Sequence, residues 1–355
     1  MRICTLDHVR PRMRLARTIY SPDGKILLSA GVAMHPSYVG KLREIGHTSV
    51  YIADGMFDDI QVPQVVKDST RVETITAVRE VMTKLPVGGK ATLTRAVKAV
   101  ESMVDEILTS REMLVGLVDL KTLDNYTYAH SVNVGILTLM IARGLGYSRG
   151  EMVDLGVGAI LHDVGKCQVE QAILLKPEQL TPSELEQVKR HTQYGFDTLR
   201  EEFKVNLLSA HIAYQHHERL DGSGYPRGLK GADIIDWAKI VSVADVYDAI
   251  TSDRVYRRRL PPSEGIRLLQ VEAAGRLDAR MVRKLTDYLV PFPIASVVRL
   301  STGETALVIS VNPKDFYRPQ VKVIKDERGR SLSTQGPVVD LAQELDVSIV
   351  KTVDL

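Results

Sequence analysis

A histidine and an aspartate are adjacent at His162 and Asp163, and Gly165 and Lys166 follow them. Adjacent side chains do not share one face of a helix, but they can converge where a helix ends, and glycine often ends helices. An imidazole and a carboxylate that converge are typical metal ligands. Lys166 adds a fixed positive charge, which a site that handles phosphate needs. One such doublet is a weak signal, so further ligands must come from elsewhere in the chain.

Six of the nine histidines fall between residues 130 and 217, where apolar residues recur at helical spacing. Taken alone, His130 is explained as a core residue and His191 as a surface residue. Asp245 interrupts an apolar helical segment, and its alternative explanation is a buried carboxylate held by a basic partner. Two further histidines are adjacent at the expected end of a helix, where both can reach one cation. The candidate metal ligands are His130, His162, Asp163, His191, His216, His217 and Asp245.

These candidates are too many for one ion, since a catalytic ion takes about three or four protein ligands. They suit two ions about 3.5–4 Å apart that share a carboxylate. Asp163 is our candidate for that bridge. The ligands expected for the first ion are His130, His162 and Asp245, and those for the second are His191, His216 and His217.

In their order and spacing, these residues resemble the HD-GYP family, a branch of the HD phosphohydrolases. The resemblance covers roughly residues 105–290 and includes the segment 216–226, which ends in Gly224, Tyr225 and Pro226. It implies an all-helical catalytic domain with two or three metal ions, usually iron or manganese. The implied reaction is hydrolysis of the cyclic dinucleotide c-di-GMP to linear pGpG, and in some members onward to GMP. Related members act on 3′,3′-cGAMP.

The resemblance also implies which residues bind substrate. Arg254 and Arg257 would contact phosphates, and residues three apart lie on one helical face. Tyr225 is available to pack on a guanine. The family usually has proline where Val255 stands. Tyr126 occupies the place of a glutamate that binds a third metal in some members, so we expect two divalent ions, iron or manganese, with zinc, nickel and magnesium as alternatives.

In the expected mechanism, two cations lower the pKa of a shared water from about 15.7 towards 7 and bind the non-bridging phosphate oxygens. The hydroxide between the ions would attack phosphorus in line with the leaving 3′ oxygen. Lys166 neutralises the charge that grows on the phosphoryl oxygens. Asp248, one turn after Asp245, either orients a metal ligand as a hydrogen-bond acceptor or lies on the helix surface.

Two other functions remain open at this point. Tyr126 and two flanking domains without an assigned role allow a module that senses c-di-GMP without cleaving it, although Lys166 and every candidate ligand are present. An HD phosphohydrolase that acts on another nucleotide, such as 3′,3′-cGAMP, is the third reading. The Gly-Tyr-Pro segment disfavours a mononucleotide or alarmone as its substrate.

The chain has 355 residues, of which 44% are hydrophobic and 25% charged, and its formal net charge is +2. This balance is typical of a globular protein and argues against a general nucleic-acid-binding surface. Two distant cysteines give no disulfide framework, and the best apolar run, 134–142, is too short to span a bilayer. We expect a cytoplasmic protein whose partner is a small cyclic dinucleotide, neither a nucleic-acid polymer nor a membrane. A homodimer and signalling proteins that contact the flanking domains are left open.

We predict a mainly α fold, in which an HD-type helical bundle is flanked by two small units. Residues 1–55 are expected to form an α/β unit, 56–104 a linker and leading helices, 105–291 the catalytic domain, and 292–355 a β-rich piece. Residues 181–184 form a capping box with Pro182 at the first helical position. Helical periodicity predicts helices at 36–45, 124–145, 152–161, 181–202, 206–217, 235–252, 263–274 and 279–289. Strands are predicted at 14–20, 26–30, 48–52, 296–300, 306–311 and 320–324.

Overall fold

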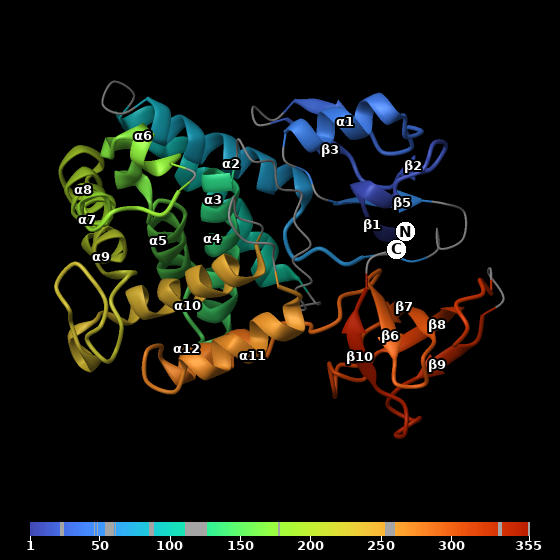
Figure 1. Ribbon diagram of the computed structural model, residues 1–355. Helices are drawn as coiled ribbons and strands as arrows, with labels where there is room; N and C mark the ends of the chain where they lie inside the picture. The colour runs from blue at the N-terminus through green and yellow to red at the C-terminus, as the bar shows by residue number, and fades with distance from the viewer. Residues whose placement is uncertain are drawn as a thin grey trace.

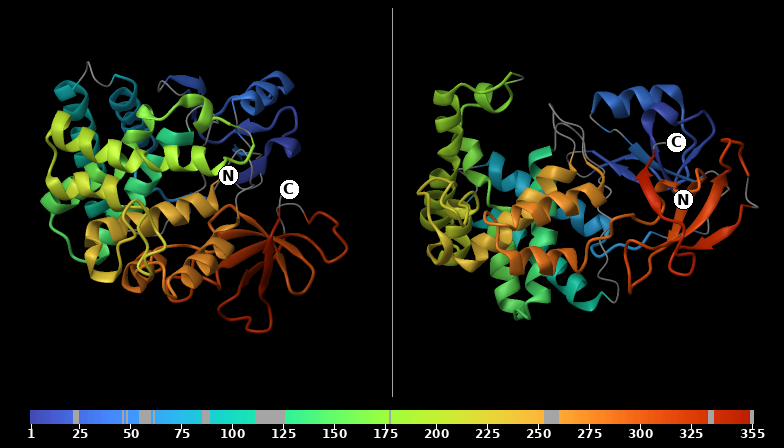
Figure 2. Two further views of the ribbon diagram at one scale, coloured as in Figure 1. Left: turned by 60° about the vertical axis from the view of Figure 1, so that its left-hand side comes forward. Right: turned by 60° about the horizontal axis from the view of Figure 1, so that its bottom comes forward.

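The computed structural model describes residues 1–21, 25–45, 47, 49–53, 60, 62–84, 89–110, 126–176, 178–252, 260–332 and 336–353. Figure 1 shows a helical lobe on the left and, on the right, a second lobe that contains the strands from both ends of the chain. The views of Figure 2 keep the same division. The predicted mainly α fold with two small strand-containing units is therefore confirmed.

The N-terminal unit packs one helix on a three-stranded antiparallel sheet with the order β1-β5-β2. Buried apolar side chains from the sheet and the helix, such as Leu15, Leu42 and Ile52, form its core. The strand predicted at 14–20 is two short strands, β2 and β3, that belong to different sheets. The elements are β1 (Arg2–Thr5), β2 (Arg14–Leu15), β3 (Ile19–Tyr20), β4 (Ile26–Leu28), α1 (Pro36–Glu44) and β5 (Ser49–Ala53).

The C-terminal unit is a five-stranded antiparallel sheet with the order β10-β6-β7-β8-β9. Its three central strands were predicted, but β9 and β10 were not, because none of their side chains is buried and they show no apolar alternation. Ile3 of β1 donates its N–H to the carbonyl oxygen of Ala295 at 3.2 Å, so the N-terminal and C-terminal units are in contact. The strands are β6 (Val297–Leu300), β7 (Thr305–Ser310), β8 (Gln320–Lys325), β9 (Val338–Asp340) and β10 (Ile349–Thr352).

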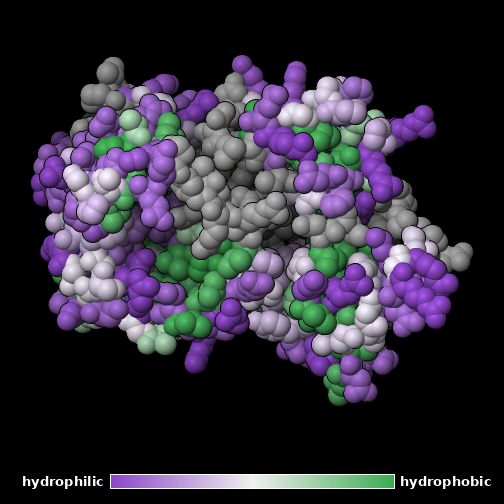
Figure 3. Space-filling view, in the orientation of Figure 1, coloured by the Kyte–Doolittle hydropathy of each residue, from purple (hydrophilic) through white to green (hydrophobic). Residues whose placement is uncertain are grey.

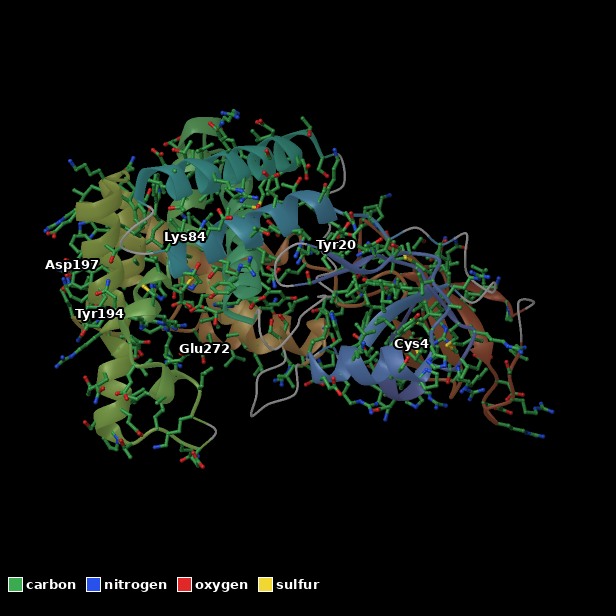
Figure 4. The ribbon with its side chains drawn as sticks, turned by 90° about the horizontal axis from the view of Figure 1, so that it is seen from above. Cys4, Tyr20, Lys84, Tyr194, Asp197 and Glu272 are labelled. Atoms are coloured by element: carbon green, nitrogen blue, oxygen red, sulfur yellow. The ribbon has the colours of Figure 1, made fainter. Side chains whose placement is uncertain are left out.

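The helical lobe is built around α4, whose residues 129–142 are all buried. A helix that is apolar on every side must be surrounded by others, and α2, α5, α10 and α12 contact it. Figure 4 views this lobe from above, with the labelled Tyr194 and Asp197 at its outer edge. The helices are α2 (Asp68–Thr83), α3 (Gly89–Thr109), α4 (Tyr126–Gly144), α5 (Arg149–Ile160), α6 (Gln171–Leu174), α7 (Pro182–Lys189), α8 (His191–Asp197), α9 (Leu207–Gln215), α10 (Asp236–Thr251), α11 (Pro262–Glu272) and α12 (Ala279–Thr286).

The helical core begins earlier in the chain than the predicted catalytic domain. The predicted boundary at 104/105 falls inside α3, and Val78 of α2 and Val100 of α3 share one core with Leu137 of α4. That boundary followed the extent of the family resemblance rather than the apolar pattern, which already continues through both leading helices. The leading helices are thus packed parts of the bundle.

Several helix boundaries differ from the predicted ones, and one of them positions a candidate ligand. The capping box at Thr181 and Glu184 is present, with the Thr181 hydroxyl accepting from the Glu184 N–H at 3.3 Å. The helix predicted over 181–202 is interrupted at Arg190, where α7 ends and α8 begins. A second capping box, Ser148 with Glu151, starts α5 three residues earlier than predicted. The interruption places His191 at the first position of α8.

Hydrophilic side chains cover much of the face drawn in Figure 3, and hydrophobic ones form separate patches, one of them around α10. Among the described residues, no helix has the length and apolar character needed to cross a membrane.

Candidate metal centre

The predicted ligands come from different elements of the helical lobe and lie in two neighbouring groups. Each group offers ligand atoms that lie within 4.8 Å of one another. His130 lies on α4, His191 on α8 and Asp245 on α10, while the two adjacent pairs lie where α5 and α9 end. The first group is His130, His162 and Asp245, and the second is Asp163, His191, His216 and His217.

Asp163 stands between the groups and turns one carboxylate oxygen to each. Its Oδ2 lies 3.4 Å from Nε2 of His162 and 4.0 Å from Nε2 of His130. Its Oδ1 lies 3.4 Å from Nε2 of His191 and 3.8 Å from Nε2 of His216. A carboxylate arranged in this way can bind two cations at once.

The turn after α5 brings the adjacent pair together. α5 ends at Ile160, residues 162 and 163 form a turn, and a 3-10 helix covers Val164–Gln168. Gly165 is needed for a different reason from the one the sequence suggested. It does not adopt the left-handed conformation that ends helices; instead, a Cβ there would lie 2.0 Å from the carbonyl oxygen of His191. The missing side chain lets α8 pack directly against the turn.

Three of the imidazoles are oriented by their own segments of chain. His162, His191 and His216 each donate Nδ1–H to the carbonyl oxygen three residues earlier, at 2.7, 2.7 and 3.0 Å. The hydrogen bond fixes the ring and leaves Nε2 directed at the cluster. Binding Nδ1 to a backbone carbonyl is a common way to prepare a histidine for a metal.

His130 is oriented by a distant carboxylate. Its Nδ1 lies 2.6 Å from Oδ2 of Asp248, and its Nε2 lies 3.2 Å from Oδ1 of Asp245. Asp248 is 1% exposed, so the surface alternative for this residue is wrong. Burial lowers the pKa of His130, but hydrogen bonds to Asp245 and Asp248 and their charges outweigh burial and raise it to about 9.

In the second group the pKa values of the histidines are lowered, in contrast to that of His130. Burial lowers the pKa of His191 to about 4 and holds those of His216 and His217 well below their usual value. Burial would raise the pKa of Asp163, but Lys166 and the neighbouring imidazoles keep it well below its ordinary value. Near pH 7 this group therefore offers neutral imidazoles and a carboxylate, the forms that bind cations.

Two buried atoms of the cluster support a divalent cation. Nε2 of His162 and Oδ1 of Asp163 have no hydrogen-bond partner among the described residues. A buried polar atom without a partner costs about 1–3 kcal/mol, so such atoms call for an explanation. Both atoms are directed at the cluster, and imidazole with carboxylate is a donor set that suits divalent first-row metals. These residues fit a divalent metal centre.

The loop after the paired histidines is held by a residue that the sequence reasoning missed. Glu218 is buried, and its carboxylate accepts from the N–H groups of Arg227 and Leu229 at 2.8 and 2.9 Å. The Tyr225 ring stacks on His217 with 4.6 Å between ring centroids. Sequence position, directly after two ligands, was the only available signal for Glu218. The loop therefore supports His217.

The remaining candidates are placed as follows. Nζ of Lys166 lies 2.5 Å from Oδ2 of Asp163, and the Lys166 side chain is 29% exposed. Arg254 and Arg257 lie outside the described residues, as does the side chain of Tyr126. Their predicted contacts with substrate stay predictions.

Comparison with protein families assigns the two regions of the chain that follow the N-terminal unit. A family described as the HD domain matches residues 90–281, more than half of the chain, and a KOW domain associated with HD domains matches residues 297–355. The chain belongs to the HD domain family.

Named relatives indicate to which branch of the HD domain family the chain belongs. The chain is 38% identical over 245 residues to a cyclic di-GMP phosphodiesterase of Pseudomonas aeruginosa. That match covers 68% of this chain and 59% of the relative. It is 41% identical over 178 residues to a cyclic di-GMP phosphodiesterase of Thermotoga maritima, covering 50% and 47%. It is 36% identical over 179 residues to the 3′3′-cGAMP-specific phosphodiesterase 1 of Vibrio cholerae, covering 50% and 41%. The resemblance to the HD-GYP branch is thereby confirmed, and the chain spans about half the length of these curated relatives.

A solved structure shares the fold. An HDG"Y"P protein from Bdellovibrio bacteriovorus has a TM-score of 0.56 and 19% sequence identity, and the match covers 80% of this chain and 98% of that one. At this identity the likeness concerns the fold alone.

Proposed function

We propose that this protein is a metal-dependent phosphodiesterase that hydrolyses c-di-GMP to pGpG. The observation that carries the proposal is the pair of ligand groups joined by Asp163, which turns one oxygen to each. The relatives named as cyclic di-GMP phosphodiesterases, at 38% and 41% identity, support the choice of substrate.

Two divalent ions, iron or manganese, are the proposed cofactors. His130, His162 and Asp245 would hold one ion, and His191, His216 and His217 the other, with Asp163 shared. When bound, the ions supply an activated water and neutralise phosphate charge.

The protein's own groups bind and orient the substrate. Lys166 keeps its ammonium group beside Asp163, where we propose that it binds a non-bridging phosphate oxygen and neutralises charge that develops during cleavage. Asp248 holds the ring of His130 with Nε2 directed at Asp245. Tyr225, whose ring stacks on His217, is proposed to pack on a guanine.

The alternatives keep specific support. Relatives named as 3′3′-cGAMP-specific phosphodiesterases make 3′,3′-cGAMP the second candidate substrate. A module that binds without cleaving is the third reading. We also propose a cytoplasmic location, because two cysteines far apart in the chain, Cys4 and Cys167, are typical of reducing compartments.

The test is turnover of c-di-GMP and 3′,3′-cGAMP by full-length protein loaded anaerobically with Mn²⁺ or Fe²⁺. We expect pGpG from c-di-GMP and loss of turnover in His162→Ala and Asp163→Ala. His8→Ala, an exposed histidine of the N-terminal unit, is the matched control and should behave as wild type. Unchanged turnover in both site variants would contradict the assignment. Binding of either nucleotide without product would instead support the sensor.

A further inference from the structure

We infer that Arg71 and Asn133 are positioning residues of the metal centre, which fix Asp248 and, through it, His130. The inference rests on the proposed function, because it assigns further residues to the same site. Neither residue belongs to the ligand set or to the substrate-binding candidates. Arg71 comes from α2, the first helix after the N-terminal unit, so the chain of contacts begins outside the elements that carry the ligands.

The contacts run in one direction, from α2 to the first ligand group. Nη2 of Arg71 donates to Oδ1 of Asn133 at 2.7 Å. Nδ2 of Asn133 donates to Oδ1 of Asp248 at 3.1 Å. The other oxygen of Asp248 accepts from Nδ1 of His130 at 2.6 Å, and Nε2 of His130 faces Asp245. Each link joins a donor to an acceptor.

Burial makes the arrangement specific. Asn133 is 0% exposed and Asp248 is 1% exposed, so neither can replace a lost contact with bulk water. The guanidinium of Arg71 has donors only, and it must therefore face the amide oxygen of Asn133. That leaves the amide nitrogen for Asp248. With the amide turned over, its oxygen would face a carboxylate oxygen, which is repulsive.

The fixed amide in turn fixes the carboxylate. Both oxygens of Asp248 are engaged, one by Asn133 and one by His130, so the carboxylate is held against rotation. His162, His191 and His216 take a carbonyl of their own segment, but His130 depends on this distant group. Partners that orient a ligand are typically worth about 10–100-fold in metal affinity.

The experiment titrates Mn²⁺ into metal-free full-length protein by calorimetry. We expect Asn133→Ala to weaken binding at one of the two Mn²⁺ sites about 10-fold and Arg71→Ala to weaken it by a smaller factor, about threefold. In the double variant, Arg71→Ala should add nothing to Asn133→Ala, because it acts through that residue.

Arg95→Ala is the matched control. It removes an arginine of α3 whose Nη1 lies 2.8 Å from Oε1 of Glu80 on α2, a contact that involves no ligand-bearing helix. Melting temperatures of the metal-free proteins are recorded alongside, since a merely structural role would lower them without a selective change at one site.

The outcomes separate the two claims. Wild-type protein that binds no Mn²⁺ overturns the proposed function and this inference with it. Normal wild-type binding with variants that match Arg95→Ala overturns the inference alone, as does an additive effect in the double variant. If Asn133→Ala does not fold, the pair Arg71→Met and Arg71→Lys decides, because lysine keeps a donor: weakened binding with methionine and recovery with lysine supports the inference, and equal binding overturns it.

Discussion

The two ligand groups of the metal centre are prepared in different ways. In the second group, His191 and His216 are oriented by carbonyl oxygens three residues earlier, and burial keeps their pKa values below the usual range. In the first group, His130 is oriented by Asp248, 118 positions away, and its pKa is raised to about 9. The imidazoles of the second group are therefore neutral near pH 7, and two of them are oriented locally. In the first group His162 is also oriented locally, but His130 depends on tertiary packing and carries a proton when no metal is bound.

The contrast shows what each group is sensitive to. A local hydrogen bond forms whenever the helix end forms, so the second group should tolerate changes elsewhere in the bundle. The first group requires α4 and α10 to be in register, since Asp248 and His130 lie on different helices. A substitution can therefore be chosen to weaken metal binding at one group while the other group serves as an internal reference.

The largest effect is expected where the groups meet. Asp163→Ala removes an oxygen from each group, so we expect turnover to fall by about 10³-fold or more and Mn²⁺ content to drop at both positions. Elemental analysis with the turnover assay measures this. Asp7→Ala, an exposed carboxylate of the N-terminal unit, is the control. Full Mn²⁺ content in Asp163→Ala would show that the groups do not share this ligand.

Gly165→Ala should act on the second group. The new Cβ would lie 2.0 Å from the carbonyl oxygen of His191, so α8 must move. We expect a loss of about 1–3 kcal/mol in stability and about 10²-fold in turnover. Gly150→Ala, where a Cβ meets nothing within 4 Å, should change stability by about 1 kcal/mol or less. Thermal melts and rates that are equal for the two variants would argue against the close packing.

Asp248→Asn should act on the first group alone. The substitution keeps the shape of the side chain and removes the charge that orients His130, so we expect about 10-fold weaker binding at one Mn²⁺ site and no change at the other. Calorimetric titration resolves the two sites. Equal weakening of both would mean that the groups are not separately prepared.

The smallest effect is expected from pH. Because the pKa of His130 is raised to about 9, a metal must displace a proton from the first group below that pH, and its affinity should rise by up to about 10-fold between pH 7 and 8. His191, with a pKa of about 4, adds no such dependence above pH 6. Mn²⁺ titrations at several pH values measure the slopes. A flat profile at both sites would contradict the proton on His130.

Much of the site could be predicted because its chemistry is carried by uncommon residue types. Adjacent histidines and a buried aspartate stand out in a helical sequence, and α4, α5 and α10 follow from periodicity. Glu218 and Asn133 could not be found in this way, since their value lies in partners that only the fold brings near. The reason for Gly165 was missed because close packing between segments leaves no pattern in a single sequence. The early start of the helical core was missed because the resemblance, rather than the apolar stripe, set the boundary.

The backbone contact between Ile3 and Ala295 has a mechanical consequence. Ile60, just before α2, packs beside Val297 and Leu307 of the C-terminal sheet. The chain therefore enters and leaves the helical lobe from one body, which is formed by the N-terminal and C-terminal units in contact. A rearrangement of that body would pull on the first and last helices together, and the first of them carries Arg71.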